Sequence, residues 1–342
     1  MTASTATAAA TAARPAPAAR PARAARAARA RRAVTAAAAA AAAAGAAMLA
    51  LAAAAPPASA AVQLGCAAVP SACCYPDATN SGVPAGTTLL AVPGQVSSGP
   101  GWHYVTSGYV AVTGAGAVLS GLYIPYNVDI TASNVTIRNS KIVTAGSFAV
   151  SLRHTTGVTI THSAISGASA TTGRAGVDIS DIYGDSTGMT ITGDNISNFK
   201  TAIQVTTGII SGNYIHDPGY VAGDHTNGIF DTGTTQALSI TGNTILNSFG
   251  QTDAISLDDS APNSPIANKT VTGNLLGGGS YTIYGGNSLG NTSTNMHIDN
   301  NRFSQAYYAR SGQYGPVAYY TTGPASTWTG NFYDTTGASI PW

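Results

Sequence analysis

Asp224-His225-Thr226-Asn227-Gly228-Ile229 is followed one repeat later by Gly250-Gln251-Thr252-Asp253-Ala254-Ile255. Each stretch ends in a small residue followed by a β-branched one, and this pair recurs along the chain at nearly even spacing. Repetition at a near-constant period is typical of a solenoid, in which each repeat forms one coil. The pairs are Ala149-Val150, Gly176-Val177, Ala202-Ile203, Gly228-Ile229, Ala254-Ile255 and Thr282-Ile283.

A second set of strands keeps step with these pairs. Val135-Thr136-Ile137 leads to Ile142, and Leu238-Ser239-Ile240 leads to Ile245. Later copies have Gly-Asn or Asn-Asn between the two strands, and both residues tolerate the positive φ of a sharp corner. An antiparallel sandwich would not place one type of strand once in every repeat. We therefore predict an all-β, single-stranded parallel β-helix, which the crossover rule makes right-handed.

The segment 1–60 differs in composition from the rest of the chain. All seven of its charged residues are Arg, and a run of mostly Ala at 36–55 is followed by Pro56-Pro57 and then Ala58-Ser59-Ala60. This order is typical of a cleaved secretory signal, of either the general or the twin-arginine type, since Arg31-Arg32 is present. We expect a secreted, extracellular protein in which residues 61–104 form an N-terminal cap and residues 105–342 form the β-helix domain, ending in an irregular aromatic region.

Charge narrows the range of partners. Without residues 1–60 the chain keeps 8 of its 15 basic residues and all 14 acidic ones, which gives 8 − 14 = −6. Nucleic-acid binding needs a basic surface, so we expect no nucleic-acid partner. We also expect no membrane association after signal cleavage, and a monomer, because a capped solenoid leaves few open strand edges.

The three cysteines lie close together at Cys66, Cys73 and Cys74. An exported chain can form a disulfide, and the spacing allows either Cys66–Cys73 or Cys66–Cys74. We favour Cys66–Cys73, which leaves Cys74 without an explanation.

The period also predicts which side chains stack in columns. If the branched residue of each pair points inward, the residue after it points outward, because side chains alternate along a strand. Basic and polar residues lie just before the strands, along one edge of this outward strip. The outward column reads Ser151, Asp178, Gln204, Phe230, Ser256 and Tyr284, and the edge contains Arg174, Lys200, His225, Asn227 and Asp253. Such a strip suits an extended polymer.

Each of these residues also has a purely structural interpretation. Lys200 can be a solvated turn residue, Asn227 can satisfy backbone groups, and Asp224 can pair with His225. Asp258 and Asp259 can cap a turn through side-chain hydrogen bonds. Asp178, Asp181 and Asp185 suit either Ca²⁺, which prefers several oxygen ligands, or a turn, so Ca²⁺ stays an open possibility.

Four stretches resemble the pectate-lyase-like superfamily of secreted parallel β-helix proteins, especially the actinobacterial right-handed β-helix repeat type. The resemblance covers roughly Tyr75 to Tyr333 and specifies the fold more than the reaction. The stretches are Tyr75-Pro76-Asp77-Ala78-Thr79-Asn80-Ser81-Gly82-Val83-Pro84, Asn134-Val135-Thr136-Ile137, Asp224–Ile229 and Gly250–Ile255.

The resemblance implies an extended polysaccharide as the partner and one of two reactions. A lyase must neutralise a uronate carboxylate and abstract the neighbouring proton. Lys200, Arg174 and Asn227 would bind the carboxylate, His225 would act as the base, and Tyr284 would act as an acid or a stacking surface. Asp178, Gln204, Phe230 and Asp258 would contact further sugar units.

A glycoside hydrolase is the second reaction that the resemblance implies. It needs two carboxylates, which Asp253 with Asp231, Asp258 or Asp259 would supply. Only half of the polygalacturonase pattern is present, so we favour the lyase. A non-catalytic glycan-binding or cell-surface protein is the third alternative.

Overall fold

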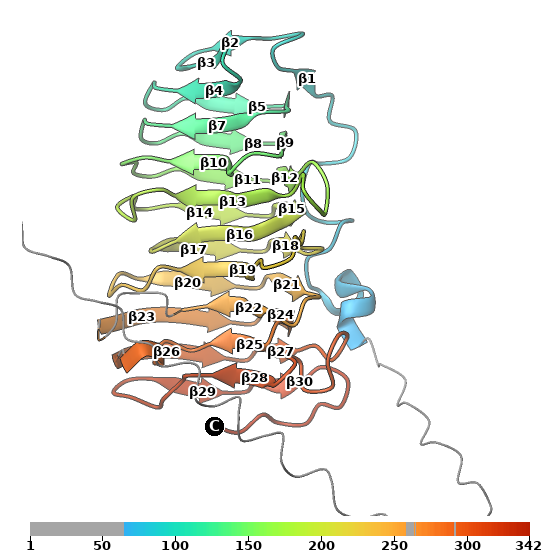
Figure 1. The fold of residues 1–342 in the computed structure, drawn as a ribbon, viewed down its shortest axis with the longest axis vertical. Helices are drawn as coiled ribbons and strands as arrows, with labels where there is room; N and C mark the ends of the chain where they lie inside the picture. Colours follow the sequence, from blue (N-terminus) through green and yellow to red (C-terminus); the bar gives the residue numbers. More distant parts are fainter. Residues whose placement is uncertain (1–64, 258–262, 264, 291) are drawn as a thin grey trace, which may run out of the picture. The chain divides into compact units, whose positions relative to one another are not determined.

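The computed structural model describes residues 65–257, 263, 265–290 and 292–342. The predicted signal sequence at 1–60 lies outside the described residues, as do Asp258 and Asp259. The described part is an all-β parallel β-helix, whose strands stack along one axis (Figure 1). Within it, no helix is long and apolar enough to cross a membrane. The predicted fold is therefore confirmed.

Three sheets form the sides of the β-helix, and a complete coil visits them in a fixed order. The 11-stranded sheet contains β2 (Ser98–Gly99), β3 (Trp102–Val105), β4 (Tyr109–Val112), β7 (Asn127–Ile130), β10 (Phe148–Leu152), β13 (Ala175–Asp181), β16 (Phe199–Val205), β19 (Thr226–Asp231), β22 (Thr252–Ser256), β25 (Tyr281–Tyr284) and β28 (Gly315–Ala318). The 9-stranded sheet contains β5 (Val118–Ser120), β8 (Thr136–Arg138), β11 (Thr159–Thr161), β14 (Thr190–Thr192), β17 (Gly208–Ser211), β20 (Leu238–Thr241), β23 (Pro265–Thr272), β26 (Thr292–Asp299) and β29 (Thr327–Thr329). The 10-stranded sheet contains β1 (Leu90–Ala91), β6 (Leu122–Ile124), β9 (Lys141–Thr144), β12 (Ala164–Gly167), β15 (Asn195–Ser197), β18 (Tyr214–Ile215), β21 (Thr244–Asn247), β24 (Leu275–Gly278), β27 (Arg302–Phe303) and β30 (Phe332–Tyr333).

The corner between the 9- and 10-stranded sheets is the sharp bend that the sequence predicts. Gly242 has φ of 64° there, and even His162 has φ of 48° in the equivalent position. The left-handed backbone turns the chain and sends the following residue into the core. Residues with positive φ at this corner are Gly121, Asn139, His162, Gly193, Gly212, Gly242, Gly273, Asn300 and Gly330.

The residue after each left-handed corner joins a buried hydrogen-bonded ladder. The side-chain Nδ2 of Asn213 donates to Asn243 Oδ1 at 3.0 Å and to the backbone carbonyl of Ile191 at 3.0 Å. Each Asn thus bridges to the next coil, which satisfies polar groups that the corner would otherwise leave unpaired in the core. The ladder runs through Ser140, Ser163, Asp194, Asn213, Asn243, Asn274, Asn301 and Asn331, all of them buried.

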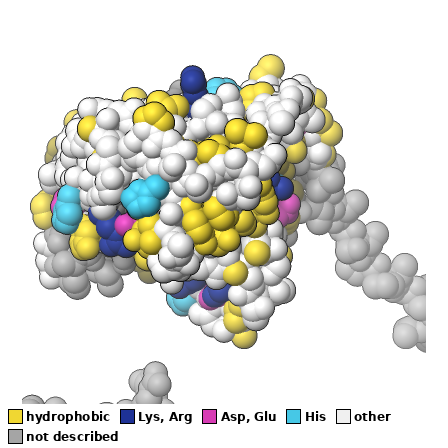
Figure 2. Space-filling view, turned by 90° about the horizontal axis from the view of Figure 1, so that it is seen from above, with side chains coloured by type: hydrophobic (Ala, Val, Ile, Leu, Met, Phe, Trp, Pro, Cys, Tyr) yellow, Lys and Arg dark blue, Asp and Glu magenta, His cyan; other side chains and the backbone are white. Residues whose placement is uncertain are grey.

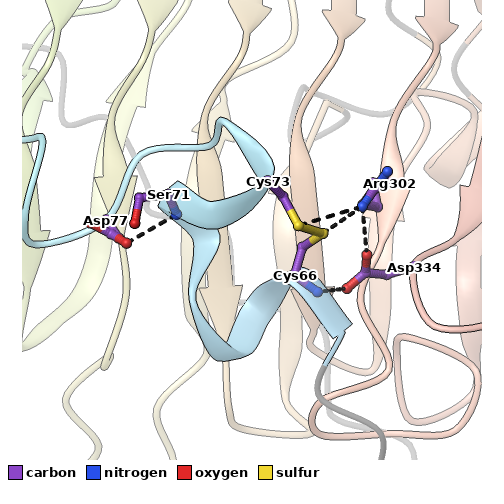
Figure 3. The surroundings of a disulfide bond; sticks show 6 residues. All are labelled: Cys66, Ser71, Cys73, Asp77, Arg302 and Asp334. Atoms are coloured by element: carbon purple, nitrogen blue, oxygen red, sulfur yellow. Dashed lines mark hydrogen bonds and ion pairs between the residues drawn. A yellow bond between two sulfur atoms is a disulfide. The ribbon is translucent and has the colours of Figure 1, made fainter.

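The N-terminal segment runs along the flank of the β-helix. The 3-10 helices η1 (Gly65–Ala68) and η2 (Pro70–Cys73) lie beside the last coils, where Asp334 accepts a 2.6 Å hydrogen bond from the backbone N–H of Cys66 (Figures 1 and 3). The disulfide is Cys66–Cys73, as predicted, and Cys74 is free and exposed. At the other end, β2 pairs antiparallel with β3 and β3 pairs antiparallel with β4, and β4 then pairs in parallel with β7. A third 3-10 helix, η3 (Ser288–Gly290), follows β25.

The strands of the 11-stranded sheet do not alternate as simply as the sequence suggested. Thr201 and Gln204 on β16 both face outward and line the same groove, while Ala202 and Ile203 between them are fully buried. Two consecutive inward residues indicate a bend like that of a β-bulge. In the coil of Gly228 no side chain fits the first of the two positions, because an added Cβ would clash with the carbonyl oxygen of Ala254 and would lie 2.5 Å from Cγ2 of Ile245 in the 10-stranded sheet. Other coils hold Ala at this position, but Thr282 shows that a larger residue also fits.

The predicted register is wrong in one coil. Ile179, not Val177, pairs with Val150 and with Ile203. Asp178 therefore occupies the small inward column between Ala149 and Ala202, and it is fully buried instead of pointing outward. The prediction failed because Gly176-Val177 imitates the small-branched pair two residues too early.

Candidate functional site

A groove of about 740 Å³ lies on the outer face of the 11-stranded sheet. Its residues come from consecutive coils, so it follows the axis along which the strands stack. The lining residues are Ser147, Phe148, Gly176, Val177, Lys200, Thr201, Gln204, His225, Asn227, Phe230, Thr252, Asp253, Ser256, Tyr284, Ser288 and Tyr319. Seven of the predicted site residues are among them.

Two columns form the floor of the groove. The first runs through paired positions from Phe148 and Val177 to Thr201, Asn227 and Asp253. The second comes three residues later in each strand and runs from Gln204 through Phe230 and Ser256 to Tyr284. Neighbouring members of a column are about 4.8 Å apart, because each is one strand further along the sheet. The bend in the strands thus creates a floor that is two columns wide.

The edge of the groove carries a cation and an imidazole from adjacent coils. Lys200 and His225 come from adjacent coils, at or just before the start of β16 and β19. No ion pair joins Lys200 to an acidic side chain among the described residues. It is the one Lys or Arg among the described lining residues. His225 is exposed, and its Nε2 lies 3.3 Å from Nε2 of Gln251.

Asn227 and Asp253 supply the amide and the carboxylate of the first floor column. Nδ2 of Asn227 donates to Thr201 Oγ1 at 3.3 Å and to the backbone carbonyl of His225 at 3.4 Å. Asp253 is paired with Asn227 in the next strand and is almost fully buried. Among the described lining residues it is the only carboxylate.

Arg174 is not part of the groove lining. Its guanidinium forms a bidentate ion pair with Asp224, and the two side chains are only 19% and 10% exposed. Hydrogen bonding to Arg174 outweighs burial and lowers the pKa of Asp224. The pair joins the loop before β13 to the loop before β19, which also carries His225. Asp224 therefore pairs with Arg174, whereas the sequence had suggested His225.

Three predicted acids lie elsewhere. Asp178 is buried with both carboxyl oxygens lacking a hydrogen-bond partner in the described chain, and burial raises its pKa well above the usual 3.8. Asp231 is fully buried, with Oδ2 2.9 Å from Nζ of Lys269. Asp258 lies outside the described residues. The outward placement of Asp178 is therefore wrong, and Asp231 does not face the groove.

Ser147, Phe148, Ser288 and Tyr319 are among the lining residues that the sequence patterns did not identify. Phe148 stands two residues before Val150, as Asn227 stands two before Ile229, so the column rule could have found it. Tyr319 comes from the aromatic C-terminal region, is 53% exposed and stacks on Tyr284 with ring centroids 5.7 Å apart. No spacing rule reaches Tyr319, because it follows a strand in an irregular coil.

The structure does not bring the candidate Ca²⁺ ligands Asp178, Asp181 and Asp185 together as one cluster. Within the described ranges, no three His, Cys, Asp or Glu side chains are grouped as metal ligands. Asp178 points into the core, so it does not join Asp181 and Asp185 in one ligand cluster.

Seen from the end that carries β2 and β3, the drawn surface is mostly uncharged with scattered basic and acidic groups (Figure 2).

Comparison with protein-family models and with curated proteins gives no match for this chain.

Proposed function

We propose that this chain is an exported polysaccharide lyase of the pectate-lyase-like superfamily, which cleaves a uronate-containing polymer by β-elimination. The observation that carries the proposal is Lys200, a cation outside every ion pair of the described residues, which lines the edge of an elongated groove together with His225 of the adjacent coil. A cation there suits a carboxylate ligand, and binding in a desolvated groove strengthens the attraction. The Cys66–Cys73 disulfide supports an oxidising, extracytoplasmic location.

The chemistry assigns one task to each group. Lys200 binds the uronate carboxylate and stabilises the negative charge that develops when C5 loses its proton. His225 takes that proton, the C5–H electrons form the C4–C5 double bond, and the bond from C4 to the leaving oxygen breaks. The leaving oxygen then takes up a proton. Asn227 and Asp253 on the floor hold sugar hydroxyls, while Phe230 and Gln204 contact the chain further along.

Tyr284 fits a stacking role better than an acid role. It lies two strands from Phe230 in the same column, which is about 10 Å along the groove. Its ring stacks with Tyr319 and its hydroxyl lies 2.8 Å from Ser280 Oγ. Aromatic faces bury the apolar side of a sugar ring.

The decisive experiment is a substrate screen with pectate, alginate and glucuronan. Lyase activity releases a product with the ultraviolet absorbance of an unsaturated uronate, and Lys200→Ala and His225→Ala should each abolish it. Lys141→Ala and His103→Ala serve as matched controls, because both residues are exposed and outside the groove lining. Full activity in both groove variants would refute the assigned roles. New reducing ends without the absorbance would instead indicate a hydrolase.

A passive glycan-binding protein is the second candidate. The stacked pair Tyr284 and Tyr319 favours it, because such a platform binds sugars without chemistry. Retention of a polysaccharide with neither new reducing ends nor new absorbance would select this alternative.

A further inference from the structure

We infer a second sugar-binding subsite, which binds the same glycan chain as the groove. It consists of Asp129, Arg153, His154, Tyr183 and Asp185, here called the Tyr183 cluster. The inference rests on the proposed function for the identity of the ligand. The cluster lies outside the groove lining, at the end of the 11-stranded sheet nearer the N-terminus.

The cluster faces the same side of the sheet as the groove. Asp129 pairs with Ser151, Ser151 pairs with Ser180, and Ser180 pairs with Gln204 of the groove floor. Asp129 is therefore three strands from Gln204 in one column, about 14 Å along the axis. Arg153 contacts Asp129 at 2.6 Å, which places the guanidinium over this column. Ser151 and Ser180, which lie between the groove and the cluster, are almost fully buried, so a polymer that continues from the groove along the axis passes above them to reach the cluster.

The side chains of the cluster hold one another in place. The ring of His154 stacks on Tyr183 with centroids 4.3 Å apart and an interplanar angle of 3°, and His154 Nδ1 lies 2.5 Å from Asp185 Oδ2. Arg153 Nη1 donates to the Tyr183 hydroxyl at 3.4 Å and lies near the ring. Tyr183 is nevertheless 56% exposed. An aromatic ring that is held by neighbouring side chains but still exposed to solvent is pre-organised for stacking, so little entropy is lost on binding.

The chemistry of the cluster indicates which part of a sugar it binds. Arg153 and Asp129 present N–H donors and carboxylate acceptors next to the Tyr183 ring, and sugar hydroxyls both donate and accept. The carboxylates of Asp129 and Asp185 offset the charge of Arg153, so the cluster does not attract a uronate carboxylate as Lys200 does. It therefore takes a pyranose ring through its hydroxyls and apolar face.

Chain length and salt distinguish this subsite from the groove. In the inactive His225→Ala background, Tyr183→Ala should weaken binding of a long polysaccharide roughly fivefold to tenfold, about one stacked aromatic contact. It should leave the Kd of a trisaccharide unchanged. Lys200→Ala should weaken binding of both ligands, with an effect that shrinks at high salt, whereas the Tyr183→Ala effect should persist. Tyr123→Ala, an exposed Tyr on β6 of the 10-stranded sheet, is the matched control.

Affinity electrophoresis and calorimetry separate failure of the subsite from failure of the proposed function. If Lys200→Ala weakens polysaccharide binding while Tyr183→Ala behaves like Tyr123→Ala at every chain length, the subsite is refuted and the groove stands. If Tyr183→Ala weakens binding and Lys200→Ala does not, the subsite stands and the lyase assignment fails. If no tested polysaccharide binds, both are refuted.

Discussion

Arg174 and Asp224 form a bidentate ion pair that joins two loops from different coils. The backbone of the same loops is in contact, since the N–H of Tyr220 donates to the carbonyl of Ala170 at 2.8 Å. Asp224 Oδ2 also accepts the N–H of Val221 at 2.8 Å, which shapes the loop that ends at His225. The pair thus positions the wall of the groove, although neither residue lines it.

Breaking this pair should cost stability and disturb the groove. Arg174→Gln leaves Asp224 without its cation, and we expect a loss of about 3 kcal/mol in the free energy of unfolding. The double variant Arg174→Gln/Asp224→Asn should lose less than the two single variants added together. Because the folded pKa of Asp224 is lowered, its contribution is present above pH 3.8 and is lost as pH falls through the folded pKa. Urea unfolding at several pH values measures both effects, and simple additivity would contradict the prediction.

Asp194→Asn should stabilise the protein. Asp194 occupies a position of the ladder where Asn213 and its successors use an amide N–H₂, and its Oδ2 has no hydrogen-bond partner in the described chain. Burial disfavours the charged carboxylate and raises the pKa of Asp194 well above 3.8. An amide restores the donor, and we expect a gain of about 1–3 kcal/mol at neutral pH. Asn213→Asp is the converse control and should destabilise. Equal melting temperatures for the wild type and Asp194→Asn would refute the argument.

Asp178→Ala should also stabilise, since the same column has Ala149 and Ala202 on either side. The wild-type carboxyl is buried without a partner in the described chain, a cost of about 1–3 kcal/mol. Its folded pKa is raised, so the folded state holds the proton that the unfolded state releases near pH 3.8. The contribution of Asp178 to stability is therefore greatest below pH 3.8 and falls as pH rises toward its folded pKa. Thermal unfolding across this range should show a smaller decline for Asp178→Ala, while an identical decline would show that Asp178 does not titrate as inferred.

The Cys66–Cys73 disulfide should hold the N-terminal segment against the last coils. The two cysteines are 7 residues apart in the chain, and Arg302 and Asp334 contact this loop from β27 and from beyond β30 (Figure 3). Cys66→Ser/Cys73→Ser should cost about 2–3 kcal/mol by the loop-entropy relation. Amide exchange should rise first in residues 65–82, with the ladder of Asn side chains still protected. Uniform loss of protection throughout the chain would show that the segment and the coils unfold as one unit. Cys74→Ser, which removes only the free thiol, is the control.

Much of the fold could be predicted because the repeat period and the residue types at the corners can be read directly from the sequence. Gly242-Asn243 predicts a left-handed corner, and the structure has one. The buried ladder that Asn243 joins could not be predicted from the sequence, because its hydrogen bonds to Asn213 and Asn274 connect different coils. The coil around Ile179 was misread for a similar reason. Gly176-Val177 fits the repeated pattern, but packing against the neighbouring strands places Ile179 in the inward column.

The repeat in the chain was enough to show that one type of strand recurs in every coil, and that recurrence placed Lys200, His225, Asn227 and Asp253 along a common edge. Three-dimensional packing was needed to show that Arg174 pairs with Asp224, that Asp178 is buried, and that Tyr319 completes the groove. The difference arises because the period fixes only the position of a residue along the stack. The direction of its side chain depends on bends within the strand and on charges from loops in other coils.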